Sequence, residues 1–319
     1  MIVRGLHFSF DAQGDAALAT LFYPGDDRRL EEARLTGQVS AAETDTPWPV
    51  VVIMPGINVV PDSYRWLAHR LVADGLCVVT YAAIGSLGPA GRGITPGIDL
   101  AALTPDAIGT RPSSTALAPL LAHLAEMAAE EHGPVAGHLD LSRVVVGGHS
   151  AGGTAALHNS DPSWVPGLQA VFCFAAHTMI ATSLGYGEAA VVAVPSKVPV
   201  MLLSGADDGV IAASRDRYRG DEGIHDPVRQ TFAEAIGRQQ GDSWLVELAD
   251  AGHFAICWPV DTTSGRSFLE SGSAGADSAV RELLGDLIAA FTAASLGRPA
   301  ASSLERLVEH QLVQHWDRR

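Results

Sequence analysis

The chain has few cysteines, few basic residues and no long apolar run, and each shortage excludes a class of protein. Its three cysteines, Cys77, Cys173 and Cys257, are odd in number and widely spaced, which suits free thiols better than a disulfide framework or a metal site. Lys and Arg number 21 against 36 Asp and Glu, and the net charge of −15 argues against nucleic acid or an anionic membrane surface as a partner. No run of 18 apolar residues predicts a membrane span.

Signals for metal binding and export are also missing. There is no H-E-x-x-H motif, no paired C-x-x-C and no clustered carboxylate and histidine spacing, so we expect neither a metal nor a cofactor. Residues 1–10 alternate apolar and polar side chains as a strand does, and they lack a basic region followed by an apolar run. We therefore expect a cytoplasmic protein.

The chain does contain enough hydrophobic residues to form a large core. Of its 319 residues 47% are hydrophobic and only 18% charged. Short apolar runs bounded by Gly and Pro alternate with segments of helical spacing, which predicts an α/β fold with a mostly parallel sheet and helices on both faces. The expected strands are 18–23, 50–54, 77–81, 143–147, 170–174, 200–204 and 244–248. The expected helices are 64–74, 115–131, 152–158, 228–237 and 278–296.

Two segments depart from this alternation. Residues 86–114 contain four prolines and five glycines without a clear period, and we interpret them as a loop that forms a wall of the active site. In the tail, residues 297–319, Ser302 and Glu305 have capping-box spacing and Leu304, Leu307, Val308 and Leu312 mark one face of a helix. We expect one domain over residues 1–296 and a helical extension over 297–319 that packs on it or forms a homodimer interface.

The expected strand 143–147 runs into Gly148-His149-Ser150-Ala151-Gly152-Gly153, and a helical segment follows. A serine at such a strand-to-helix turn is held on a strained backbone with its hydroxyl exposed, and the flanking glycines avoid collisions. This pattern predicts that Ser150 is a nucleophile.

Three further turns agree with the prediction that Ser150 is a nucleophile. Pro55-Gly56-Ile57-Asn58 follows a buried strand, where a backbone N–H can help to bind an oxyanion. Gly205-Ala206-Asp207-Asp208 and Ala251-Gly252-His253-Phe254 follow two later strands, so an acid and a histidine come after Ser150 in the order Ser, Asp, His. We expect His253 to be the general base and Asp208 the acid that orients it.

The core from about residue 18 to 291 resembles the α/β-hydrolases without a large lid, a group that includes dienelactone hydrolases, chlorophyllases, platelet-activating-factor acetylhydrolases and cutinase-like polyester hydrolases. The similar segments are residues 51–56, 67–79, 139–143, 148–153, 205–208 and 252–253. The resemblance implies an α/β-hydrolase fold without a separate lid domain and oxyanion donors at the backbone N–H of Ile57 and Ala151. It also places the acid at the fourth residue of a Gly-x-x-Asp turn, which is Asp208. Pro55-Gly56 replaces the His-Gly of many relatives, and no His-Gly-Gly-Gly run is present, so an esterase of the hormone-sensitive-lipase type is disfavoured.

Four residues near these motifs are candidates for lining a substrate pocket. Asn58 lies in the first turn, His149 precedes the serine, His177 follows the strand 170–174, and Trp258 lies five residues after His253. We expect structural support to be the main role of His149, because its side chain should point away from Ser150.

The sequence thus predicts a hydrolase that cleaves an ester, thioester or lactone through an acyl-enzyme on Ser150. Two alternatives stay open: an acyltransferase or cyclase that uses the same three residues, and a catalytically silent hydrolase fold that binds a ligand. The substrate depends on the segments 86–114, 175–195 and 258–276, whose shapes periodicity does not give.

Overall fold

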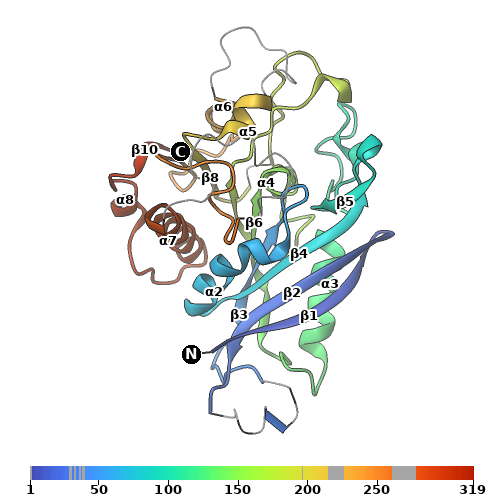
Figure 1. The fold of residues 1–319 in the computed structure, drawn as a ribbon, viewed down its shortest axis with the longest axis vertical. Helices are drawn as coiled ribbons and strands as arrows, with labels where there is room; N and C mark the ends of the chain where they lie inside the picture. Colours follow the sequence, from blue (N-terminus) through green and yellow to red (C-terminus); the bar gives the residue numbers. More distant parts are fainter. Residues whose placement is uncertain are drawn as a thin grey trace.

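The computed structural model describes residues 2–28, 31, 34–35, 37, 40–195, 197–214, 226–260 and 278–319. These residues form one sheet of ten strands in the order β1-β2-β4-β3-β6-β7-β8-β9-β10, with β5 paired to β4 (Figure 1). The strands are β1 (Ile2–Ala12), β2 (Asp15–Gly25), β3 (Trp48–Met54), β4 (Cys77–Ser86), β5 (Arg92–Thr95), β6 (Leu139–His149), β7 (Leu168–Phe174), β8 (Val200–Gly205), β9 (Trp244–Leu248) and β10 (Val313–Arg318).

The six central strands β4, β3, β6, β7, β8 and β9 are all parallel. Every residue of β3 is buried, as expected for a strand covered on both faces of a parallel sheet. All seven strands that the sequence predicts are present, and the alternating N-terminal residues form β1. Because the strands are parallel, the turns that follow β3, β6, β8 and β9 meet at one edge of the sheet.

The helices are α2 (Arg65–Ala73), α3 (Leu117–Ala129), α4 (Ala151–His158), α5 (Gly209–Ser214), α6 (Pro227–Glu234), α7 (Ser278–Ser295) and α8 (Leu304–Leu307). Helices α2 and α7 contact each other on one side of the sheet, whereas α3 lies behind β1 and β2 in Figure 1 and packs on β1 and β6. The helices predicted from the sequence therefore exist and cover both faces, which makes this an α/β protein with a mixed, mostly parallel sheet.

Residues 86–114 are more ordered than the expected loop. They contain the short helices η2 (Gly88–Ala90) and η3 (Leu100–Leu103) and the strand β5, which pairs antiparallel with the end of β4. Leu103 packs with Ile180 and Val192 of the segment after β7, so the two segments share a small apolar cluster outside the main core. The prediction of a structureless loop is wrong, because short elements of three or four residues leave no periodicity that the sequence can show.

The helical extension predicted for residues 297–319 is also corrected. Only Leu304–Leu307 is helical, and Val313–Arg318 forms β10, which pairs antiparallel with β9. Leu304 and Val308 are buried as the helical spacing predicts, but the chain then leaves the helix and covers the backbone groups along the edge of β9. An edge strand needs only six residues here, and its alternation is too short to predict.

Candidate active site

Ser150 lies in the sharp turn between β6 and α4. Its backbone has φ 54° and ψ −123°, a conformation that a residue with a side chain rarely adopts and that costs free energy. The turn is tight because α4 packs closely on β3: a Cβ on Gly152 would lie 2.3 Å from the backbone oxygen of Met54. Close backbone approach therefore requires a glycine two residues after the serine, and Ser150 itself is held at the end of β6.

Asp208 and His253 form a buried hydrogen-bonded pair. Nδ1 of His253 lies 2.8 Å from Oδ2 of Asp208, and both side chains are buried. Oδ1 of Asp208 accepts a hydrogen bond from the backbone N–H of Ile211 at 2.8 Å, which fixes the carboxylate. A carboxylate on Nδ1 keeps the proton on that nitrogen, so Nε2 of the neutral ring is the acceptor.

The adjacent acid, Asp207, has a different environment. It is exposed, and its backbone N–H donates to the backbone oxygen of Ala251 at 3.0 Å. Of the two acids, Asp208 contacts the histidine, as the sequence predicts.

Ser150 and His253 line the same cavity, whose volume is about 660 Å³. It is lined by the turn after β3, by α4 and by residues of the segments 86–114 and 175–195. The segment 86–114 thus contributes Leu87, Ile98 and Leu103 to the wall, in agreement with the expected position of that segment.

Both predicted oxyanion donors are in this cavity. Ala151 is the first residue of α4, and the N–H groups of a first helical turn have no acceptor within their own helix. Ile57 follows Gly56 in the turn after β3, and the next residue, Asn58, is fixed by a 2.9 Å hydrogen bond from its N–H to the backbone oxygen of Ile94. Both residues therefore line the cavity that Ser150 also lines.

His149 lines the cavity but is fully buried, and both of its ring nitrogens have partners. Nδ1 lies 2.9 Å from the hydroxyl of Tyr64, and Nε2 lies 2.9 Å from the backbone oxygen of His253. The Tyr64 hydroxyl also accepts a hydrogen bond from the N–H of Gly56 at 3.0 Å. Burial holds the pKa of His149 well below its ordinary value, so the ring is neutral.

These contacts fix the tautomer of His149. Because a carbonyl oxygen only accepts, Nε2 carries the proton and donates to His253, and Nδ1 accepts from Tyr64. The structural role expected for His149 agrees with this network. Tyr64 is not among the predicted site residues, because its helical spacing assigns it to the core.

The remaining candidates have mixed outcomes. Asn58 and His177 line the cavity, and burial lowers the pKa of His177 to about 4. Trp258 is not among the described lining residues: the guanidinium of Arg281 lies 4.2 Å from the centre of its ring, outside the cavity. Most of the third segment expected to shape the site, residues 261–276, lies outside the described residues.

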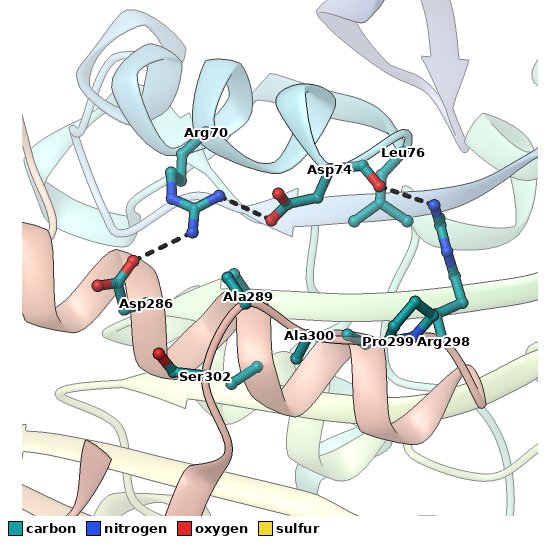
Figure 2. A pocket seen from close by; sticks show the side chains of 12 residues that line it. Arg70, Asp74, Leu76, Asp286, Ala289, Arg298, Pro299, Ala300 and Ser302 are labelled. Atoms are coloured by element: carbon teal, nitrogen blue, oxygen red, sulfur yellow. Dashed lines mark hydrogen bonds and ion pairs between the residues drawn. The ribbon is translucent and has the colours of Figure 1, made fainter. Parts of the chain in front are cut away.

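A second pocket, of about 230 Å³, lies between α2, α7 and the chain that follows α7 (Figure 2). Its charged groups bind one another: Arg70 bridges Asp74 and Asp286 at 2.7 and 3.1 Å. Arg298 donates to the backbone oxygens of Asp74 and Gly75 at the end of α2. The contacts of Arg298 tie the tail to α2. Among the described residues that line this pocket, no nucleophile is paired with a base.

The described residues include no group of three or more His, Cys, Asp or Glu side chains arranged to hold a metal ion. In the same part of the chain, no helix combines the length and apolar character needed to cross a membrane. No protein-family model and no curated protein matches this sequence.

Proposed function

We propose that this chain is a serine hydrolase of the α/β-hydrolase fold that cleaves a carboxylic ester, thioester or lactone. The observation that carries the proposal is the strained backbone of Ser150 at the end of β6, in one cavity with a histidine that a buried aspartate orients. A structural serine has no need of a left-handed backbone that costs free energy, and a structural histidine has no need of a buried carboxylate partner.

The first half of the reaction follows from these groups. Oγ of Ser150 attacks the acyl carbon while Nε2 of His253 takes the hydroxyl proton, and Asp208 stabilises the imidazolium that forms. The former carbonyl oxygen becomes an oxyanion, which accepts hydrogen bonds from the N–H groups of Ile57 and Ala151. The bond to the leaving group then breaks, and His253 returns the proton to it.

The second half repeats these steps with water. His253 takes a proton from the water that attacks the acyl-enzyme, and the proton returns to Ser150 when the acid leaves. An acyltransferase would replace this water with another acceptor.

The test is covalent labelling combined with turnover. A fluorophosphonate probe should label the protein, and the Ser150→Ala variant should lose both the label and the hydrolysis of p-nitrophenyl esters, with kcat falling on the order of 10⁶-fold. Ser142→Ala, which changes an exposed serine near the other end of β6, is the matched control and should keep both. Label that persists in Ser150→Ala would overturn the assignment, and label without hydrolysis would favour acyl transfer.

A further inference from the structure

The cavity extends along one face of α4. Ala151, Thr154 and His158 all line it, and their spacing of three and four residues places them on the same side of the helix. Ser150 precedes the helix and His158 is its last residue. At 1.5 Å per residue, the cavity therefore runs roughly 12 Å from the nucleophile to the histidine.

Much of the wall around this path is aliphatic. Among the described lining residues there is no Lys, Arg, Asp or Glu, so this part of the structure offers no counter-ion for a charged substrate group. Two segments supply the aliphatic side chains opposite α4, among them Leu103, Met179, Ile180 and Leu184. Such a wall fits an uncharged, largely aliphatic chain.

His158 is a polar residue at the end of this path, and Asn58, Thr154 and His177 also line the cavity. The side chain of His158 is more than nine-tenths buried, and its Nε2 has no hydrogen-bond partner among the described residues. Burial lowers the pKa of the ring to about 4, so at neutral pH it carries one N–H donor and one acceptor nitrogen. A buried polar nitrogen without a partner is unfavourable, and a ligand that supplies a partner would bind more tightly for that reason.

We infer that His158 determines specificity for an uncharged ester whose aliphatic arm carries a hydroxyl or carbonyl group on the order of 10 Å from the ester carbonyl. This inference rests on the proposed function, since it takes Ser150 as the point of attack. The arm lies along α4, and its polar group makes the hydrogen bond that Nε2 of His158 lacks. A hydroxyl can donate or accept a hydrogen bond, whereas a ketone only accepts. Comparing the two groups therefore shows whether Nε2 of His158 donates or accepts.

The experiment compares three p-nitrophenyl esters of straight acids of about eight to ten carbons, a length that matches the roughly 12 Å along α4. One ends in a methyl group, one in a hydroxyl and one in a methyl ketone. The wild-type kcat/KM should favour at least one polar-ended ester over the methyl-ended ester by about tenfold, the value of one buried hydrogen bond. In His158→Phe the ratio of kcat/KM for the polar-ended ester to kcat/KM for the methyl-ended ester should fall to about one or below. In His158→Gln part of the wild-type ratio should remain.

The matched control is His138→Phe, which changes a histidine before the opposite end of β6 and should keep the wild-type preference. Binding gives a second measurement: in Ser150→Ala, the Kd for the polar-ended ester should be about tenfold below that for the methyl-ended ester, and His158→Gln should narrow the gap. Equal preference in wild type and both His158 variants would overturn the inference. If short esters are hydrolysed without any such preference, only the role of His158 fails; if no ester is hydrolysed and no probe binds covalently, the proposed function fails as well.

Discussion

The hydroxyl of Tyr64 lies 2.9 Å from Nδ1 of His149, and this contact joins the two sides of the candidate site. On one side the Tyr64 hydroxyl accepts from the N–H of Gly56, next to the predicted oxyanion donor Ile57. On the other side His149 donates to the backbone oxygen of His253, the proposed general base. A neutral, buried chain of hydrogen bonds thus sets the distance between the oxyanion turn and the base loop.

Removing the Tyr64 hydroxyl should therefore affect catalysis more than folding. In Tyr64→Phe we expect kcat on an activated ester to fall about tenfold with little change in KM, because a shift of the Gly56 turn weakens binding of the oxyanion and not of the substrate. The free energy of unfolding should fall by about 1 kcal/mol, the usual value of one hydrogen bond.

Tyr81→Phe is the matched control for this change. Tyr81 is also fully buried, and its hydroxyl donates to the backbone oxygen of Pro96 at 2.7 Å, away from the cavity. In urea denaturation, Tyr81→Phe should lose about as much free energy of unfolding as Tyr64→Phe does, but its kcat should equal that of the wild type. Equal kcat values for the two variants would show that the Tyr64 network only supports the fold.

The adjacent acids give a second prediction. Asp208→Asn should lower kcat by up to about 10⁴-fold, because an amide in contact with Nδ1 of His253 favours the wrong tautomer of the ring. Asp207→Asn, at an exposed side chain, should be close to wild type. The kcat of both variants is measured on one ester after circular dichroism confirms that they are folded. If Asp207→Asn were inactive and Asp208→Asn active, the acid would be Asp207.

The buried histidine at the end of α4 predicts how stability depends on pH. An unfolded histidine has a pKa of about 6.5, whereas burial lowers the pKa of His158 to about 4. Between these values the unfolded chain binds a proton that the native protein does not, so lowering the pH destabilises the native state by about 1.4 kcal/mol per pH unit for this group. Above pH 7 both states are neutral at this position and the contribution is constant.

The measurement is urea denaturation at pH 7, 6 and 5 of the wild type and His158→Gln. Other groups add to the absolute slope, so the comparison uses the difference between the two proteins. The slope of the variant should be shallower by up to about 1.4 kcal/mol per pH unit. If the free energy of unfolding of the two proteins depended on pH in the same way, His158 would take up its proton equally in the native and unfolded states.

The sequence predicted the sheet well because parallel strands covered on both faces are short, continuous apolar runs, as β3 shows. It also predicted the contact between Asp208 and His253, because the turns after β8 and β9 must meet at one edge of a parallel sheet. It did not predict the partners of His149 or the unpaired nitrogen of His158, because these depend on which side chains meet across the fold. Helical spacing alone assigns Tyr64 to the core, and only the structure shows where its hydroxyl points.

The same limit explains the error in the C-terminal tail, and it leads to a last prediction. The strand β10 covers the edge of β9, where the ring of Trp316 packs 6.0 Å from that of Trp244 and the guanidinium of Arg318 lies 4.5 Å from the Trp244 ring. Deleting residues 313–319 should expose the backbone groups of β9 and the face of Trp244. A bare, apolar edge strand is a template for pairing with another chain, so the truncated protein should lose stability and self-associate.

Light scattering during size-exclusion chromatography would detect the association, and urea denaturation would measure the lost stability. The matched variant is Arg318→Gln, which keeps the strand and removes the guanidinium that lies over Trp244 and pairs with Glu305. It should keep the wild-type size and lose about 1 kcal/mol or less. A truncated protein that elutes as the wild type does and unfolds at the same urea concentration would show that β10 is dispensable to the sheet.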